Sequence, residues 1–283
     1  MIVPMKRLTL IGLANEREQV LCALQRLKAV QIISEGQLTD SAKLRLLEEK
    51  VDRLDSARKS IKAYYKKSLL SPTPQCTEDQ LYKSKASGDA LCREIEGLES
   101  EQSACKAEIE REKALIASLE PFRELGTDIE LIKPTKHISY ILGVADAKAM
   151  EVIESIESCL DTHIGLETFG AEGARAVIIA CQSIDYEPVM RMLKETGFVE
   201  FMPPKLTGTF SQNIEKEKAK LTSISERLEE INKQLAEAAK KRAELDMAAD
   251  AYAIERDRAQ GDAALSVSEY AYVLDGWARA DRL

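Results

Sequence analysis

Histidines and cysteines are the residues of this 283-residue chain best suited to bind a metal ion or act as nucleophiles. His137 and His163 stand at the starts of two expected strands, with no Cys, Asp or Glu at ligand spacing. Ordinary strand-edge histidines are therefore favoured over a metal site. The cysteines form no CxxC pair and no regular spacing, which predicts reduced thiols, several of them buried. They are Cys22, Cys76, Cys92, Cys105, Cys159 and Cys181.

Other motifs that could carry chemistry are incomplete. The turn at residues 12–15 faintly resembles a phosphate-binding loop but lacks a second glycine and a Gly-Lys-Ser/Thr sequence. The acidic pairs at 48–49 and 229–230 and the basic run at 240–242 are typical of solvated helix faces. No nucleophile, base and orienting group can be assembled. The sequence therefore predicts no catalytic, cofactor-binding or metal-binding residues and no enzyme activity of its own.

The composition excludes several classes of partner. A net charge of −8 argues against a nucleic-acid or anionic-membrane surface, since either requires a positive field. No apolar run approaches the roughly 20 residues needed to span a bilayer, and residues 1–7 lack a signal-peptide layout. We expect a soluble segment of cytoplasmic type.

Residues 211–258 carry an apolar seam at alternating three- and four-residue spacing, which predicts one long helix in a coiled coil. Residues 77–119 follow the same rhythm, so the two segments are expected to pair antiparallel within one monomer. One register places Leu119 against Ile214 and Cys105 against Leu228, and a shift of one heptad fits nearly as well. Polar or small residues interrupt both seams: Glu217 and Arg242 in the second, and Ser84, Gly88, Gln102 and Glu112 in the first.

A further helix is expected over residues 41–70, ended by Pro72 and Pro74, because neither proline fits inside a helix. Its seam predicts a packed face, but its position relative to the two long helices stays open.

The strand signals define two lobes. Between residues 127 and 205 the pattern is β-α-β-β-α-β, which predicts a ferredoxin-like sandwich. Its strands are expected at 137–144, 163–169, 175–181 and 198–202, and its helices at 147–160 and 185–196. A β-α-β unit at 6–34 and a strand at 268–276 make three-quarters of the same pattern, which suggests that this lobe is truncated at residue 283.

The predicted fold class is therefore α+β, with two ferredoxin-like lobes joined by a long antiparallel coiled-coil bundle. One lobe is incomplete and split between the chain ends, at 1–36 plus 265–283. The helical rod comprises 41–120 plus 211–260, and the distal lobe 127–205.

The opening segment Val3-Pro4-Met5-Lys6-Arg7-Leu8-Thr9-Leu10-Ile11-Gly12, the paired long helices and the late Val273-Leu274-Asp275-Gly276-Trp277 carry a resemblance. Over essentially the whole chain, in order, the sequence resembles the cytoplasmic N-terminal region of subunit I of archaeal/vacuolar-type rotary ATPases, which is called subunit a in the eukaryotic enzyme.

The resemblance implies a non-catalytic stator and scaffold of a proton-translocating V/A-type ATPase, at the cytoplasmic face of the membrane. Its implied partners are the E and G subunits of the peripheral stalks. A C-terminal membrane half, absent here, would meet the rotor ring and make the full-length protein an integral membrane protein.

The distal lobe offers a candidate docking edge. The second and fourth strands of a ferredoxin-like sheet lie at its edges, and much of the chain's scarce aromatic and sulfur surface is expected there. The residues are Phe169, Phe198, Phe201 and Met202. The alternative is that these side chains pack under the sheet.

Two other function classes remain open. Paired ferredoxin-like lobes also occur in small-molecule-sensing regulatory proteins, which would require glycine-rich ligand turns where this chain has Ala145-Asp146 and Ser183-Ile184-Asp185. An SMC-like coiled-coil protein would require a P-loop near the N-terminus, and the sequence contains none.

Overall fold

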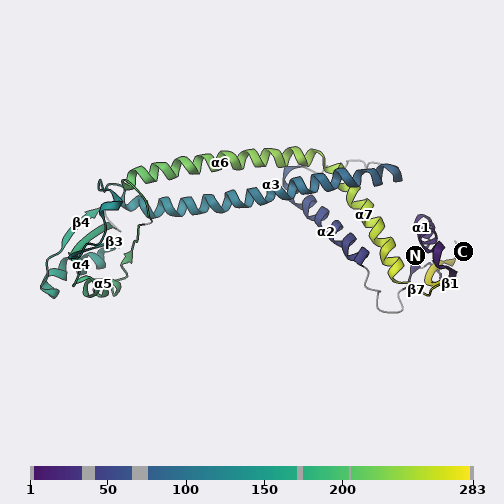
Figure 1. Cartoon of the computed structure of the whole chain (residues 1–283), viewed down its shortest axis with the longest axis horizontal. Coiled ribbons are helices and arrows are strands. Elements are labelled where there is room, and N and C mark those ends of the chain that lie inside the picture. The colour runs from purple at the N-terminus through teal and green to yellow at the C-terminus, as the bar shows by residue number, and fades with distance from the viewer. Residues whose placement is uncertain (1–2, 34–41, 66–75, 171–174, 204, 281–283) are drawn as a thin grey trace. The chain divides into compact units, whose positions relative to one another are not determined.

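The computed structural model describes residues 3–33, 42–65, 76–170, 175–203 and 205–280. These residues form helices and two antiparallel sheets, which confirms the α+β class (Figure 1). The chain divides into two compact units, one of Met1–Glu101 with Ile231–Leu283 and one of Gln102–Glu230. The long helices α3 (Glu78–Leu119) and α6 (Phe210–Lys240) contribute residues to both.

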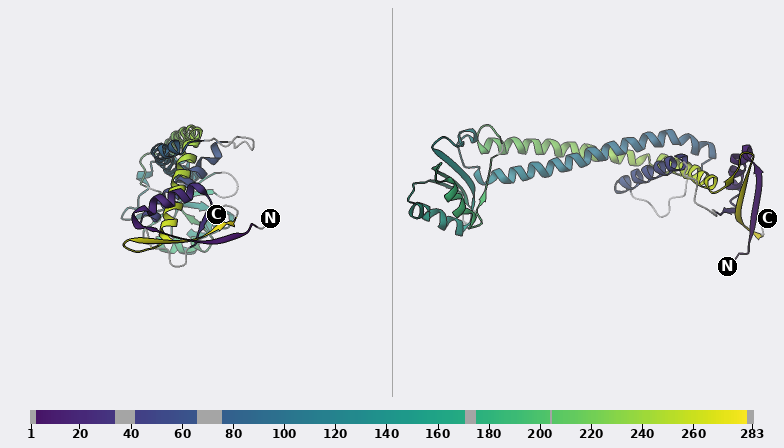
Figure 2. Two further views of the ribbon diagram at one scale, coloured as in Figure 1. Left: turned by 90° about the vertical axis from the view of Figure 1, so that its right-hand side faces the viewer. Right: turned by 60° about the horizontal axis from the view of Figure 1, so that its bottom comes forward.

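The sheet of the first unit is built around β8 (Ala271–Arg279). β1 (Met5–Leu13) pairs with it along nine positions, and Figure 2 shows the two strands side by side. β2 (Val30–Ile32) and β7 (Ser266–Val267) also pair antiparallel to β8. The early β-α-β segment and the late strand therefore share one sheet, as the sequence indicates.

The chain between β1 and β2 forms one helix, which packs on this sheet. A 3-10 turn (Ala14–Glu16) precedes this helix, α1 (Arg17–Leu27). Leu21 of α1 packs with Tyr272 and Leu274 of β8 in a buried core. The expected end of β2 at Ser34 and the expected truncation of the lobe at residue 283 lie outside the described residues.

The other helices of the first unit are α2 (Ala42–Ser60), the N-terminal part of α3, residues 231–240 of α6, and α7 (Arg242–Ala263). The single helix expected over 211–258 is wrong, because the chain leaves helical geometry at Lys241 and α7 begins at the next residue. A polar run at 240–242 supplies no apolar side chain to hold one continuous axis against a neighbour.

Helix α2 closes this bundle. It buries Leu44, Leu47, Val51 and Leu54, which are the seam predicted from the sequence, and a 3-10 turn at Ile61–Tyr64 follows it. It packs on α7 and is joined to α3 by ion pairs. The expected continuation of this helix to residue 70 is wrong, because the α-helix ends at Ser60 and the backbone is already extended at Tyr65. Pro72 and Pro74 lie outside the described residues.

The sheet of the second unit has the order β4-β5-β3-β6. Its strands are β3 (Ile138–Ala145), β4 (Gly165–Phe169), β5 (Arg175–Gln182) and β6 (Val199–Glu200). Helix α4 (Ala147–Leu160) follows β3, and α5 (Tyr186–Lys194) follows β5. The second and fourth strands of the unit therefore lie at the sheet edges, in agreement with the sequence.

Both faces of this sheet are packed with apolar side chains, because successive side chains along a strand point to opposite faces. Ile141, Val177 and Ile179 pack with α4 and α5. Leu142, Ala176 and Ile178 pack on the other face with the last turn of α3, the first turn of α6 and the 3-10 turns at Glu120–Phe122 and Ile129–Leu131. Leu119 and Ile214, which one of the predicted registers pairs, both belong to this second cluster.

Candidate functional site

The side chains suited to metal or nucleophilic chemistry do not assemble in the described part of the chain. The His163 ring is fully exposed, and its Nδ1 atom lies 3.9 Å from Glu157. No group of three His, Cys, Asp or Glu residues among those described could hold a metal ion. The six cysteines are free thiols, and Cys92 and Cys181 are buried, as predicted. Gly12 lies inside β1 and not in a loop.

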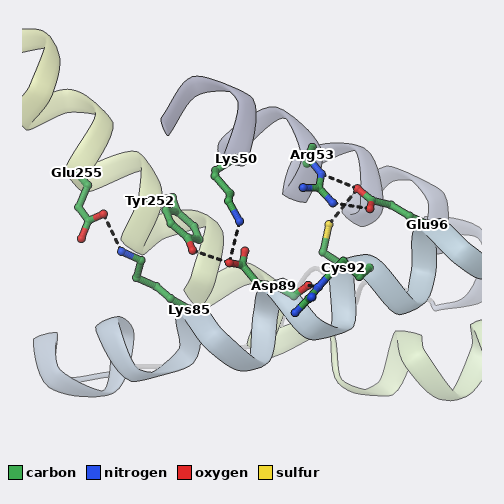
Figure 3. A network of polar contacts seen from close by, with 9 residues as sticks. Lys50, Arg53, Lys85, Asp89, Cys92, Glu96, Tyr252 and Glu255 are labelled. Atoms are coloured by element: carbon green, nitrogen blue, oxygen red, sulfur yellow. Dashed lines mark hydrogen bonds and ion pairs between the residues drawn. The ribbon is translucent and has the colours of Figure 1, made fainter. Parts of the chain in front are cut away.

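The densest set of polar contacts instead joins helices α2, α3 and α7 (Figure 3). We call this set the interhelical network. It consists of Lys50 and Arg53 from α2, Lys85, Asp89, Cys92 and Glu96 from α3, and Tyr252 and Glu255 from α7. Each helix contributes side chains one or two turns apart, so the contacts follow the helix axes.

Asp89 is the node of the network. Its Oδ2 atom accepts hydrogen bonds from Lys50 Nζ at 3.0 Å and from the Tyr252 hydroxyl at 2.7 Å. Burial, followed by the hydrogen bond to Asp89, raises the pKa of Tyr252 well above its ordinary value of 10.0. Lys85 pairs with Glu255 at 2.7 Å and lies over the Tyr252 ring, 4.4 Å from its centroid. One α3 carboxylate therefore holds both neighbouring helices.

A second contact of the network ties α2 to α3. Arg53 donates two hydrogen bonds to the carboxylate of Glu96, at 2.9 and 2.6 Å. This forked geometry fixes the relative position of the two helices more strictly than a single-point contact. The Cys92 thiol donates to Glu96 at 3.5 Å, and burial, followed by the charge of Glu96, raises its pKa to about 11. Cys92 is therefore a protonated structural thiol and not a nucleophile.

Gly88 permits the close approach of α3 and α7 beside this network. A Cβ atom at this position would lie 2.2 Å from the Cβ of Ala248 and 3.2 Å from the Glu244 carbonyl oxygen. Real Cβ atoms do not approach this closely, so any larger residue would push the helices apart. The glycine that weakens the seam in the sequence therefore marks a close contact between α3 and α7.

Arg242, one of the two residues that interrupt the second seam, begins α7. Its guanidinium lies 3.1 Å from Asp246 and covers the Tyr65 ring at 4.4 Å from the centroid. Arg58 of α2 reaches the same Asp246 at 2.8 Å. Arg242 thus links the start of α7 to the turn after α2 through Tyr65, and Asp246 links it to α2 through Arg58.

The four candidate docking residues are placed differently from one another. Phe198 is buried against Gly143, where no Cβ would fit beside its ring. Phe201 stacks on Phe122 at 4.9 Å between ring centroids, and Phe169 packs against the same cluster. Met202 is 75% exposed. Three of the four therefore pack within the second unit, and Met202 alone of them faces solvent.

Sequence reasoning missed the interhelical network. Its members lie outside or at the margin of the apolar seams, and charged residues on helix faces are normally solvated. The available signal was their spacing: Lys85, Asp89 and Glu96 recur at four- and seven-residue intervals along one face of α3.

The described residues define an α+β protein whose polar side chains join helices to one another. Within the described part of the chain, no helix combines the length and apolar character needed to cross a bilayer. The chain matches no protein-family model and no curated protein sequence.

Among solved structures, the fold is similar to a crystal structure of the cytoplasmic N-terminal domain of subunit I, a homolog of subunit a, of V-ATPase. The match has a TM-score of 0.57 and 17% sequence identity, and it covers 96% of this chain and 92% of that one. The likeness establishes the fold.

Proposed function

We propose that this chain is the non-catalytic stator and scaffold segment of a proton-translocating V/A-type rotary ATPase, linking peripheral stalks to the membrane sector at its cytoplasmic face. The observation that carries the proposal is the fold match to the V-ATPase domain, which extends over 96% of this chain. A match of that extent involves both sheets and the long helices, and not one common motif.

We further propose that the two lobes and the helical rod have different roles. Two ferredoxin-like lobes, at 1–36 plus 265–283 and at 127–205, are proposed to receive stalks. The rod, at 41–120 plus 211–260, joins them. Its supports are the two antiparallel sheets and the long helices α3 and α6.

The interhelical network suits such a role. A stator resists torque, so its helices must not slide past each other. Side chains that bridge α2, α3 and α7, with close packing at Gly88, oppose sliding because any shift in register breaks several contacts together. A scaffold of this kind requires no catalytic group.

We place the stalk-docking surface of the distal lobe at the outer edge of β6, because this strand pairs only with β3 among the described strands. Val199 is 66% exposed and Met202 75% exposed at this edge. An unpaired strand edge with exposed apolar side chains can accept a partner helix or strand. The proposed partner is a heterodimer of the peripheral-stalk subunits E and G.

The test is a calorimetric titration of this chain with the E–G heterodimer. Met202→Asp should weaken binding about tenfold or more, because a charge would be buried in an apolar contact. Ile184→Asp is the matched control, since Ile184 is 82% exposed in the turn after β5, away from this edge.

Two outcomes of the titration count against the proposal. If the unmodified chain fails to bind the heterodimer, the stator function is wrong. If it binds and Met202→Asp binds equally well, the function stands and the docking edge is wrong.

A further inference from the structure

Two glutamates face each other inside the paired helices of the second unit. Glu112 comes from α3 and Glu217 from α6, and their carboxyl groups lie close enough to interact directly. Both sit in seam positions that apolar residues would normally occupy. Glu217 is only 2% exposed, which is rare for a carboxylate.

A hydrogen bond between two carboxyl groups requires a proton, because ionised carboxylates only accept. The Oε2 atoms of Glu112 and Glu217 are both buried, and neither receives a well-aligned hydrogen bond from an N–H or hydroxyl group in the described part of the chain. Two negative charges in contact, one of them on the buried Glu217, would repel more strongly here than in water. One of the two glutamates must therefore be protonated for the helices to pack as they do.

The surrounding charges decide which glutamate holds the proton. The charged groups that face the pair among the described residues are Lys216 and Lys220 from α6 and Glu108 from α3. Lys220 Nζ lies 2.5 Å from Glu217 Oε2. The lysines favour a charged Glu217, whereas Glu108 disfavours a charge on Glu112.

The pKa values follow from this arrangement. Burial, then the hydrogen bond and the charge of Glu217, raise the pKa of Glu112 above its ordinary value of 4.5. Burial alone would raise the pKa of Glu217, but hydrogen bonds from Lys220 and Glu112 more than offset it and lower that pKa. Glu112 is therefore the donor and Glu217 the ionised acceptor.

We propose that Glu112 and Glu217 share one proton between α3 and α6, and that loss of this proton as the pH rises loosens the contact between the two helices. The pair acts as a pH-sensitive latch on the section of the second unit that contains no third helix among the described residues. Nothing in this inference depends on the identity of a stalk partner.

The direction of the pH dependence follows from the two pKa shifts. Glu112 holds its proton more tightly in the folded chain than in the unfolded chain, so its contribution to stability is lost as the pH rises above 4.5 and through its raised pKa. Glu217 contributes in the opposite direction, and its share is lost as the pH falls through its lowered pKa. The contact is tightest between the two.

The experiment measures backbone hydrogen exchange of the full chain by mass spectrometry between about pH 5 and pH 8, corrected for the intrinsic exchange rates, over the peptides that contain Glu112 and Glu217. In the unmodified chain, the protection of these peptides should fall about tenfold across this range, because loss of the shared proton leaves two carboxylates that repel each other.

Glu112→Gln should remove this pH dependence while keeping the protection high. The glutamine amide has the same shape as the protonated carboxyl group and donates permanently to Glu217. Glu110→Gln is the matched control on the same helix, because the Glu110 side chain is 74% exposed, and it should behave like the unmodified chain.

A second measurement keeps the test independent of the folding of any variant. Carbon-13 NMR titration of the glutamate carboxyl groups in the unmodified chain should show one group that titrates above 4.5 and one below. If the protection of Glu112→Gln follows the pH as in the unmodified chain, or is low at every pH, the shared proton is refuted. Two carboxyl groups titrating together at their ordinary value would refute it equally.

Discussion

The two parts of helix α3 carry the same seam and bury it to different extents. In the first unit Leu91, Ile95 and Leu98 are 4%, 0% and 8% exposed. In the second unit Cys105 and Ile109 are only half-buried. The first part is packed against both α2 and α7, whereas the second has α6 as its helical partner among the described elements. A uniform heptad pattern therefore hides two different kinds of helix packing.

The residues that interrupt the seams differ in the same way. Arg242 in the first unit pairs with Asp246 on its own helix and lies over the ring of Tyr65, in the turn after α2. Glu217 in the second unit finds Glu112 across the helix pair and Lys220 on its own helix. Where a third helix is present, the polar residue in the seam pairs with a group of opposite charge. Where α3 and α6 pair alone among the described helices, the proposal is that the two glutamates share a proton.

The largest expected effect is at the close contact between α3 and α7 at Gly88. Gly88→Ala should lower the unfolding free energy by about 1–3 kcal/mol, because overpacking against Ala248 outweighs the better helix propensity of alanine. Gly97→Ala on the same helix is the control. A Cβ there meets nothing within 4 Å, so stability should rise by up to about 1 kcal/mol. Thermal and urea unfolding measure both, and equal shifts would show that α3 and α7 are not in close contact.

The difference between the two parts of α3 should also appear without mutation. Amide exchange in the turns that contain Ile95 and Leu98 should be about tenfold slower than in those that contain Cys105 and Ile109, which corresponds to about 1.4 kcal/mol of opening free energy. Exchange mass spectrometry with overlapping α3 peptides resolves the two regions. Uniform protection along the helix would contradict the distinction drawn between them.

A smaller effect is expected at the node of the interhelical network. Tyr252→Phe removes the hydroxyl that donates to Asp89 but keeps the ring below Lys85, so it should cost about 1 kcal/mol of stability. Tyr270→Phe is the matched control, because Tyr270 is 75% exposed in the same unit.

The pH dependence of the Tyr252→Phe effect has a definite sign. The raised pKa keeps Tyr252 protonated in the folded chain while the unfolded chain ionises, so the unmodified protein loses stability as the pH rises above 10.0. Tyr252→Phe should lose less stability over that range in thermal unfolding. An identical loss in both proteins would mean that Tyr252 is not buried against Asp89.

Much of the fold could be predicted from the sequence where a local pattern and its partner lie close together. Helix α4 begins at Ala147 and ends at Leu160, as expected, because Asp146 caps it by accepting a hydrogen bond from the Ala149 amide and an apolar stripe continues to its end. The edge positions of β4 and β6 also follow from the order of elements in the second unit.

The missed features depend on long-range contacts. A heptad seam predicts that a helix has a partner, but it does not state how many, so the packing of α2 on α7 and the break at Lys241 were not accessible. Phe201 was expected at a strand edge. Its amide donates to the Leu142 carbonyl at 2.7 Å, which turns its ring inward onto Phe122.

The central position of β8 has a consequence for the order of folding during synthesis. β1 and β2 are made long before β8, yet each pairs with β8 and not with the other. Their sheet therefore forms only after residues 271–279 are made, whereas Gln102–Glu230 are a continuous unit that can fold earlier. Until β8 is made, the nascent chain carries β1 and β2 as unpaired strands. We therefore expect misassembly and chaperone binding to be most frequent before residues 271–279 are synthesised.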